Sequence, residues 1–409
     1  MVDSPLDLPD PPLGGAAERG LRALERVAGA AALKTLTGPE LMLERARLLG
    51  LTFRDRIAPG GACRLLDAAD GTIAVNLPRD SDWELLSAWL ETNDAIDTAW
   101  DHLARAVRER PVDALEERAR ILGLAVAAVR APASTPPPFF RVEGPPLNES
   151  AVGSKPVGRA PRVIDLSALW AGPLCGHLLH LCGAEVVKVE ALDRPDGARF
   201  GNADFYALLN QGKRSVAVDF GSAHGRQALA RLIETADIVI EASRPRALAH
   251  LGIRPEEVVR RCPKLTWVSI TGYGRSEPAA DWIAFGDDAG VAAGLGDVMR
   301  SATGAPQFAG DAIADPLTGI QAALAAWCSW TQGGGRLIGL ALADVAGASQ
   351  ADALRHLGRE ALLKTWGQWW CTVTGRRLDA STGTRTATAP VRELGADTAE
   401  VLAALEPLC

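Results

Sequence analysis

The stretch RVIDLSALWAGPLCGHLLHLCGAEVVKVE (162–190) contains the pattern that decides the fold. RVIDLS is typical of a short buried strand, GPLCGHLLHLCG is typical of an apolar helix that ends at Gly183, and EVVKVE is a second strand. Further strands are predicted in SVAVDF, DIVIEA and LTWVSIT, with the helix AHGRQALARLIETA after the first of them. Short strands that alternate with helices predict a doubly wound, mostly parallel, Rossmann-like α/β sheet.

Outside this large domain, the sequence predicts a small α+β domain. Residues 1–16 are expected to form a flexible leader and 17–130 the small domain, in which CRLLDAA and TIAVNL form a hairpin across an Asp70-Gly71 turn. Residues 131–161 are rich in Pro, Gly, Ser and Ala, which is typical of a linker. The large domain is expected over 162–350, and 351–409 form a helical or irregular segment that completes the fold.

Composition excludes several classes of function. The 409 residues include 43 Lys and Arg against 50 Asp and Glu, a net charge of −7, so no broad nucleic-acid surface is expected. A local basic site for a phosphorylated ligand stays open. No apolar run is long enough for a membrane span, and the acidic, Pro-rich beginning of the chain does not resemble a signal peptide. The seven Cys lack a C-x-x-C pair, which argues against a zinc or disulfide framework and favours a reducing cytoplasm.

Several familiar catalytic motifs are missing from the sequence. The turn ALWAGP has one Gly where a dinucleotide fingerprint has three, and there is no P-loop, H-E-x-x-H or G-x-S-x-G motif. His177 and His180 lie three residues apart on an apolar helix with no carboxylate between them. We therefore interpret them as core histidines rather than metal ligands, and predict no metal site.

Asp315, in IADPLTGIQAALAAW, has two readings. Asp before Pro and a long apolar helix suits an N-cap with Pro at the first helical position. The same place suits a nucleophile, because free N–H groups and the helix dipole stabilise an ionised carboxylate that can attack a carbonyl carbon.

Two basic pairs and one turn are candidate ligand contacts. Lys213 and Arg214 stand at the entry to a strand, where two adjacent cations are either solvated surface or a phosphate site. Arg244 and Arg246 lie just beyond the end of another strand, on the edge where open α/β sheets bind ligands. The turn GYG (272–274) follows the fifth strand and is either a simple turn or a backbone approach to a ligand.

In this order, these pieces resemble the family III CoA-transferases, the CaiB/BaiF group that includes formyl-CoA transferases and α-methylacyl-CoA racemases. The resemblance covers roughly 160–350 and is carried by VIDLSALWAGPLCGHLLHLCGAEVVKVEAL, LLNQGKRSVAVDF, ADIVIEASRPRALAHLGI, LTWVSITGYGRSEPAADW, IADPLTGIQAALAAW and GGGRLIGLALADVA. CRLLDAADGTIAVNLPRDSDWELLSAWL and LGLAVAAVRAP are similar to the family's small domain, which usually follows the large one. The domain order here is therefore predicted to be permuted.

The resemblance implies a mechanism and a nucleophile. In the family, an Asp carboxylate attacks an acyl-CoA thioester to give a mixed anhydride and then an aspartyl-CoA thioester, from which an acceptor acid takes CoA. Asp315 matches the position of that Asp. CoA or acyl-CoA is then a substrate rather than a permanently bound cofactor, and a carboxylic acid is the other substrate. Family members form interlocked homodimers, so a homodimer is expected here.

The resemblance also implies contacts with CoA. Trp170, Ala171, Gly172 and Pro173 match the A-G-P turn that lies against CoA, and Lys213 with Arg214 match an element near the nucleotide. Ala242, Ser243 and Arg244 match E-N-F/Y-R-P, although the Asn and the aromatic residue are replaced here. The turn Gly272, Tyr273 and Gly274 completes the set. Gly60 and Gly61 lie where some transferases have a glycine-rich loop over the active site.

Departures from the family pattern leave two alternatives. The D and Q positions of G-F-D-x-x-x-Q-A are Gly286 and Gly290 here, which favours a non-catalytic CoA-binding relative as the second hypothesis. Racemase members have a His where this chain has Phe285. Because an α-proton racemase needs an acid and a base on opposite faces of the carbon, an acyl-CoA racemase or epimerase is the third and weakest hypothesis.

Overall fold

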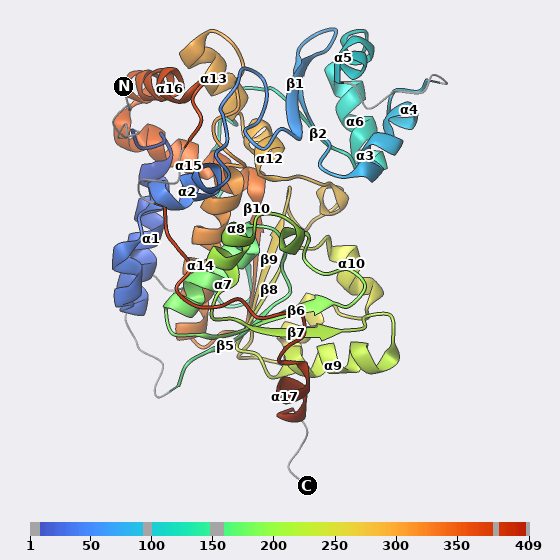
Figure 1. The fold of residues 1–409 in the computed structure, drawn as a ribbon, viewed down its shortest axis with the longest axis vertical. Coiled ribbons are helices and arrows are strands. Elements are labelled where there is room, and N and C mark those ends of the chain that lie inside the picture. The colour runs from blue at the N-terminus through green and yellow to red at the C-terminus, as the bar shows by residue number, and fades with distance from the viewer. Residues whose placement is uncertain (1–8, 93–99, 148–158, 379–383, 406–409) are drawn as a thin grey trace.

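The large sheet has the predicted doubly wound α/β architecture. A computed structural model describes residues 9–92, 100–147, 159–378 and 384–405 (Figure 1). Within these ranges seven strands form the sheet in the order β4-β10-β9-β8-β5-β6-β7. The strands are β4 (Arg141–Glu143), β5 (Arg162–Asp165), β6 (Glu185–Ala191), β7 (Arg214–Val218), β8 (Ile238–Glu241), β9 (Thr266–Thr271) and β10 (Arg336–Ala341).

The strand order places a ligand-binding crevice. All neighbours from β10 to β7 are parallel, and only β4 is antiparallel to its neighbour β10. The chain starts the parallel sheet at β5, runs outward through β6 and β7, and returns to add β8 on the other side of β5. In open α/β sheets ligands bind beyond the carboxyl ends of the strands where the order reverses, which here lies between β5 and β8.

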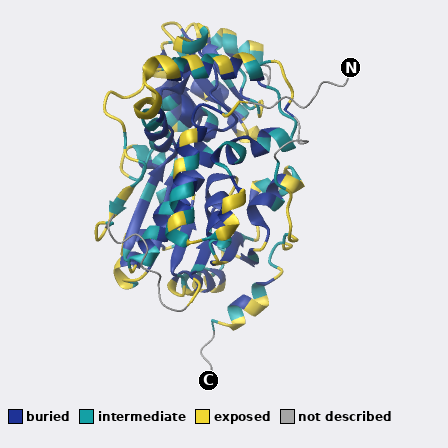
Figure 2. Cartoon of the chain, turned by 90° about the vertical axis from the view of Figure 1, so that its left-hand side faces the viewer, coloured by how far each residue is buried: buried dark blue, intermediate teal, exposed yellow. Residues whose placement is uncertain are grey.

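Helices cover both faces of this sheet, because neighbouring strand residues alternate between two cores. Val163 and Val186 belong to one core, with helices α1 (Gly14–Ala28), α7 (Ala171–Leu181) and α14 (Ala314–Thr331). Ile164 and Val187 belong to the other, with α9 (Ala223–Glu234), α10 (Pro245–His250), α11 (Pro255–Arg261) and α17 (Thr398–Ala403). Figure 2 shows the strands and inner helices buried and the outer helices partly exposed.

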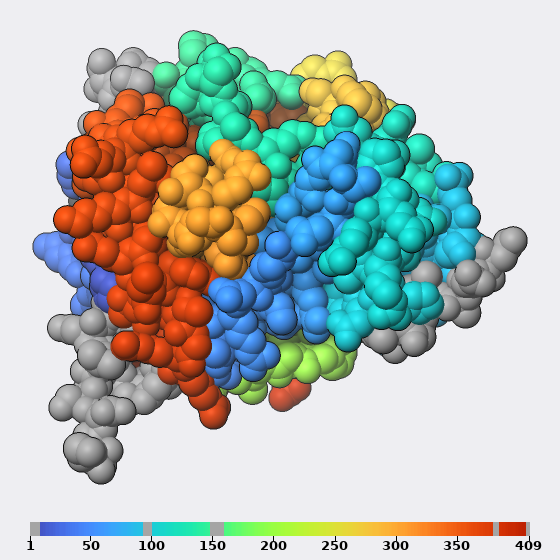
Figure 3. Space-filling view, turned by 90° about the horizontal axis from the view of Figure 1, so that it is seen from above, coloured from blue at the N-terminus to red at the C-terminus, as the bar shows by residue number. Residues whose placement is uncertain are grey.

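The small antiparallel sheet contains the predicted hairpin. β1 (Cys63–Asp67) pairs with β2 (Thr72–Asn76), and β2 pairs with β3 (Ala125–Ala128). The helices beside it are α3 (Asp80–Glu84), α4 (Leu86–Trp89), α5 (Trp100–Arg108) and α6 (Val112–Leu122). Figure 3 shows these segments side by side with α13 (Leu295–Thr303) and α16 (Arg359–Val373) at one end of the molecule.

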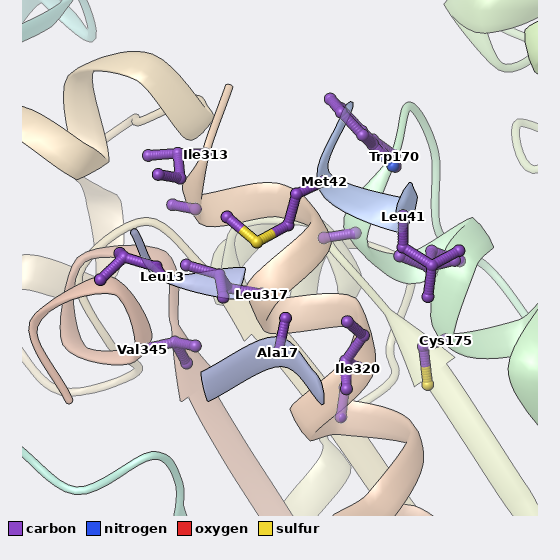
Figure 4. Close-up of a cluster of buried hydrophobic side chains, with 14 of the residues drawn as sticks. Leu13, Ala17, Leu41, Met42, Trp170, Cys175, Ile313, Leu317, Ile320 and Val345 are labelled. Carbon is purple, nitrogen blue, oxygen red and sulfur yellow. The ribbon is translucent and has the colours of Figure 1, made fainter. Parts of the chain in front are cut away.

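The first two helices pack on the large domain, whereas the sequence placed them in the small domain and the leader. Leu13, expected in a flexible leader, is fully buried. α2 (Gly38–Leu48) begins with a capping box between Thr37 and Glu40, and its Leu41 and Met42 contact the core beside α14 (Figure 4). The segment before Leu51 therefore extends the large domain's core.

The predicted linker is partly a strand. Residues 141–143 form β4, which pairs with Leu337, Ile338 and Gly339 of β10. The Pro-rich stretch is thereby attached to one outer edge of the large sheet. Residues 148–158 of the predicted linker lie outside the described residues.

The C-terminal segment covers the opposite edge. After α15 (Leu342–Leu357) and α16, residues near α17 lie along β7. The Asp397 carboxylate accepts from the Ser215 N–H at 2.8 Å, and Thr398 Oγ1 accepts from the Ala217 N–H at 3.0 Å. Asp397 N–H donates back to the Ser215 carbonyl at 2.9 Å. Within the described ranges no helix is both long and apolar enough to cross a membrane.

Candidate active site

Asp315 lies in the first turn of α14, close to the crevice between β5 and β8. The helix begins at Ala314, and the Asp315 side chain accepts no bond from its own helix start, so the predicted N-cap is wrong. Instead, the carboxylate is stabilised by the backbone N–H groups of Ala171, at the start of α7, and Gly286, at the start of α12 (Gly286–Ala292). As a residue, Asp315 is only partly buried.

Gly286 leaves the space that Asp315 occupies. A Cβ at Gly286 would lie 2.2 Å from Oδ2 of Asp315 and 2.4 Å from the Ala312 carbonyl oxygen. No side chain fits there without displacing the carboxylate. The family pattern has a polar side chain at this position. Its absence here is what allows the Asp315 carboxylate to lie against Gly286.

Carboxyl groups gather around Asp315. Burial raises the pKa of Asp315 to about 6, with a further increase from Asp311 and an opposing effect of Arg45 and the two N–H groups. Burial likewise raises the pKa of Asp287 to about 8 and of Asp288 to about 7. At neutral pH Asp315 is therefore mainly ionised, while Asp287 mainly holds its proton.

Arg45, from α2, supplies the positive charge of this cluster. Its Nε donates to Oδ2 of Asp311 at 2.8 Å, and its Nη2 donates to Oδ1 at 2.5 Å. The guanidinium lies 5.3 Å from the ring centroid of Trp170, and a Cβ at Gly60 would lie 2.9 Å from Nη2. The predicted glycine loop at Gly60 is thus next to the cluster.

The turn after β5 forms one wall of the site. Trp170 is buried and packs edge-on against Phe205. Ala171 provides an N–H group to Asp315, and Gly172 lies so close to Ser167 that a Cβ would come within 2.2 Å of its side chain. Pro173 contributes its carbonyl oxygen to Lys213 instead of facing the crevice. The structure thus brings the predicted turn and Asp315 together.

Lys213 and Arg214 lie elsewhere. The Lys213 ammonium is buried and donates to Asp165, the Pro173 carbonyl and Asn210 at 2.8, 2.9 and 3.1 Å. All three of its donors are therefore used inside the protein, which does not support a direct contact with CoA. Arg214 begins β7, at the amino end of the strands, and pairs with Glu185 and Glu400.

Arg244 has the opposite environment. It follows β8 at the carboxyl edge of the sheet, and its guanidinium forms no ion pair or hydrogen bond with the described residues. Burial lowers the pKa of Arg244, and the charges of Arg246, Arg79 and Arg194 lower it further, whereas Asp281 opposes them. Ala242 is exposed beside it, and Ser243 donates its N–H and hydroxyl to Glu241, which shapes the turn.

A cleft of about 710 Å³ opens beside Arg244, between α6 of the small domain and the loops after β8 and β9. Arg120 lies 3.8 Å from the centroid of the Trp282 ring on its wall, and Trp282 packs edge-on against Tyr273. Gly272 and Gly274 flank Tyr273, and the Gly274 N–H donates to Thr271. The predicted GYG turn therefore lies next to the cleft through the contact of Tyr273 with Trp282, and burial, with a further effect of Asp288, raises the pKa of Tyr273.

The histidines of α7 do not form a metal site. His177 is buried and contacts Arg385 at 2.9 Å. Among the described residues, no group of three or more His, Cys, Asp or Glu is arranged to hold a metal ion.

Comparison with known proteins identifies the family. The sequence model of CoA-transferase family III matches residues 160–365, about half of the chain. The chain belongs to CoA-transferase family III. The match spans β5 to α16 and includes Asp315, Arg244 and the GYG turn.

Similar proteins bear related names. A succinate–glutarate CoA-transferase of Agrobacterium fabrum is 34% identical over 208 residues, 47% of this chain and 52% of the relative. A probable fatty acyl-CoA transferase of Mycobacterium tuberculosis, Rv3272, is 34% identical over 216 residues, 49% of this chain and 54% of the relative. A crystal structure of Rv3272 is 33% identical, with a TM-score of 0.44, and the match covers 49% of this chain and 61% of that chain. This chain thus spans about half the length of the curated relatives that it matches.

Sequence reasoning missed the surroundings of Asp315. Arg45, Asp287, Asp288 and Asp311 carry no motif, and they are separated from one another by up to 266 positions. The one available signal was the pair of adjacent acids in AFGDDAG, because two carboxylates at the start of an apolar helix need a reason to be buried.

Proposed function

We propose that this chain is an acyl-CoA:carboxylate CoA-transferase with Asp315 as its nucleophile. The observation that carries the proposal is the environment of Asp315. This partly exposed residue lies at the position of the family's nucleophile, and two backbone N–H groups lie beside its carboxylate. Its pKa of about 6 leaves it ionised at neutral pH, and its buried surroundings keep it poorly hydrated. Both conditions favour attack on a thioester.

In the proposed reaction, Asp315 first takes CoA from the donor acyl-CoA and then passes it to the acceptor acid. The Asp315 carboxylate attacks the thioester carbonyl, and the C–S bond breaks. CoA departs as a thiolate, and the acyl group stays on Asp315 as a mixed anhydride. The thiolate then attacks the Asp315 carbonyl carbon, which releases the donor acid as its carboxylate and leaves an aspartyl-CoA thioester. The acceptor carboxylate reverses these steps, so the new acyl-CoA departs and the Asp315 carboxylate is restored.

The backbone donors have a defined place in these steps. Each attack creates a negatively charged oxygen, and N–H groups fixed in a water-poor site stabilise such an oxyanion. The N–H groups of Ala171 and Gly286 already face the Asp315 carboxyl. They are therefore placed to stabilise the oxyanion that forms when thiolate or acceptor attacks the Asp315 carbonyl.

CoA is proposed to enter along the carboxyl edge of the sheet. The Arg244 guanidinium forms no ion pair with the described residues, and Asp281, Arg79 and Arg194 lie near enough for their charges to interact with it. Arg79 also lies 5.9 Å from the centroid of the Phe285 ring, next to Gly286 and the nucleophile. These cations suit the phosphates of CoA at one end of a path whose other end is Asp315.

The two alternatives receive less support from the site. The non-catalytic hypothesis rested on the altered polar positions, Gly286 among them, and on the permuted domain order. Of these, the lack of a side chain at Gly286 makes room for the Asp315 carboxylate. For a racemase, Phe285 offers no proton donor where racemases have His. A homodimer in a reducing cytoplasm remains part of the proposal. The described cysteines form no disulfide. Sedimentation will measure the stoichiometry.

Mass spectrometry after incubation with a panel of acyl-CoAs tests the proposal. With hydroxylamine as a trap, we expect a hydroxamate on Asp315, and Asp315→Asn is expected to lower transfer by on the order of 10³-fold or more. Asp297→Asn, on the surface helix α13, serves as the matched control and should retain activity. Full transfer by the Asp315→Asn protein would rule out the nucleophile. Binding of CoA without any adduct would favour the non-catalytic relative.

A further inference from the structure

The cation nearest the nucleophile comes from a part of the chain that the family match does not include. Arg45 lies on α2, whereas the match begins at residue 160. Its guanidinium forms a two-bond pair with Asp311, whose side chain is completely buried, and keeps 24% of its own surface exposed. Gly60 and the Trp170 ring confine the guanidinium from two sides. Arg45 is therefore held in one place.

Titratable side chains from the neighbouring elements lie around the pair of Arg45 and Asp311. Asp315 lies on α14, Asp287 and Asp288 on α12, and Asp311 on the loop before α14. Burial opposes the charge of Arg45, but Asp311, Asp287 and Asp315 outweigh burial and raise its pKa. Cys63 of β1 and Tyr273 face the α12 acids from the other side, and both are neutral because burial raises their pKa well above the ordinary value.

We propose that Arg45 and Asp311 form a charge pair that sets the ionisation of Asp315, with Arg45 as a positioning residue for the reaction. The inference rests on the proposed function of Asp315. Arg45 favours the carboxylate form, and Asp311 opposes it by sharing the guanidinium and adding a negative charge. The two members of the pair thus act on Asp315 in opposite directions.

The reaction gives this pair a second purpose. Asp315 loses its negative charge whenever it becomes an anhydride or a thioester. A mostly buried guanidinium left with no partner would then be strongly unfavourable. Asp311 is not consumed in these steps, and its two bonds from Arg45 keep the guanidinium in place until the Asp315 carboxylate returns.

Opposite shifts in titration test the proposal without relying on activity. The protein is labelled with ¹³C at the aspartate carboxyl carbons, and the Asp315 resonance is assigned by its loss in Asp315→Asn. Arg45→Gln is expected to raise the titration midpoint of Asp315, and Asp311→Asn to lower it. An upward shift of one pH unit corresponds to roughly a tenfold loss of ionised Asp315 below the midpoint. The acid limb of the transfer rate should move with it in the same direction.

Controls distinguish charge from architecture. Arg26→Gln, at the exposed end of α1, should leave the midpoint unchanged, and the Arg45→Gln/Asp311→Asn double variant should return it towards the wild-type value. Shifts of the same sign for the two single variants would show that the pair is only a structural clamp, and would overturn the proposal. If Arg45→Gln does not fold, Asp311→Asn decides: an unchanged or raised midpoint overturns the proposal.

The two proposals can fail separately. Opposite shifts together with full transfer by Asp315→Asn would leave the charge pair standing and remove the nucleophile. A hydroxamate on Asp315 together with shifts of the same sign would keep the nucleophile and remove the charge pair.

Discussion

Gly286 shows how a missing side chain can define a site. The space beside the Gly286 α-carbon, where a Cβ would lie, is occupied by an oxygen of Asp315. A small residue in a sequence motif is easily interpreted as the loss of a catalytic group. Here the same residue makes room for the carboxylate of Asp315, the proposed nucleophile, which comes from another helix.

We expect Gly286→Ala to displace Asp315 and impair transfer. The new Cβ would lie 2.2 Å from Oδ2 of Asp315 and 2.4 Å from the Ala312 carbonyl oxygen, and rotation of a side chain cannot relieve the backbone contact. A misplacement of about 1 Å can cost on the order of 10²-fold in rate. Steady-state kinetics checks this, with Gly15→Ala on the exposed side of α1 as the control, which should stabilise its helix by about 1 kcal/mol. Unchanged kinetics of Gly286→Ala would contradict the close contact described between Gly286 and the Asp315 carboxylate.

The stability of the protein should depend on pH through Asp287. Its pKa is raised from 3.8 to about 8, so the folded chain holds a proton that the unfolded chain releases. The favourable contribution is complete below the unfolded pKa and disappears as the pH rises through about 8. Asp287→Asn should therefore become increasingly stable relative to the wild type between pH 5 and 8, by on the order of 1.4 kcal/mol for each unit by which the two pKa values differ.

Chemical denaturation at several pH values measures this difference. The Asn side chain can still accept the N–H of Ala312, which lies 2.8 Å from Oδ1 of Asp287, so the fold should persist. A free-energy difference between the two proteins that stays constant across this range would contradict the assignment of a buried, protonated carboxyl.

At this scale the sequence could predict residues that carry a local signature. Asp315 precedes Pro and an apolar helix, and Arg244 follows a strand. Arg45 and Asp311 have no such signature, because their roles arise from a contact across 266 positions that only tertiary packing creates. Lys213 shows the converse. Its sequence pattern predicted a contact with a ligand, but its ammonium group is paired with Asp165 inside the protein.

At the scale of elements, α2 is the helix that connects the N-terminal part to the site. Arg45 joins it to Asp311, and the preceding residue, Glu44, is fully buried and accepts two bonds from Arg385 at 2.9 Å. Arg385 also reaches His177 on α7. The C-terminal segment therefore fixes α2 against the helix that provides the Ala171 N–H group.

Arg385→Gln is expected to destabilise the protein by about 3–5 kcal/mol, because it leaves Glu44 buried without its cation. Burial already raises the pKa of Glu44 despite Arg385, so the variant should recover part of its stability at low pH, where Glu44 takes up a proton. Denaturant titration of Arg385→Gln and of Glu44→Gln/Arg385→Gln separates the effects. A double variant that is as unstable as Arg385→Gln would argue against a buried-charge penalty.

The elements themselves were largely predictable. Buried parallel strands consist of continuous β-rich runs, so β5, β6, β7, β8 and β9 were recognisable from residues 162–271. The docking of α1 and α2 on α14 was not, because an amphipathic helix shows that it needs a partner but not which one. β4 was hidden in a Pro-rich stretch because an edge strand of three residues has no periodicity to detect.

At the scale of the whole molecule, the two basic clusters lie at opposite ends of the strands. Arg244 follows β8 at the carboxyl end, whereas Arg214 begins β7 at the amino end. Only the first position adjoins the crevice at the switch in strand order. The fold therefore separates two patterns that the sequence analysis both predicted as contacts with CoA.

We expect Arg244→Gln to weaken CoA binding by about 10-fold or more, since a charge-assisted hydrogen bond contributes about 1.5–3 kcal/mol. The salt dependence of binding should also become weaker. Arg214→Gln, at the far edge, is the matched control and should bind CoA normally. Isothermal titration at two salt concentrations measures both effects, and equal losses for the two variants would contradict the proposed route of CoA.

The coverage of β10 and β7 has a consequence for how this protein avoids aggregation. An outer strand with free N–H and C=O groups is a template on which other chains can assemble. Here β4 occupies the edge of β10, and the segment around Asp397 and Thr398 occupies the N–H groups of β7. Both covering segments lie outside the stretch that matches the family, residues 160–365. The parts of the chain that look peripheral to catalysis thus act as a guard against intermolecular β-pairing, a risk that would grow with protein concentration if either were removed.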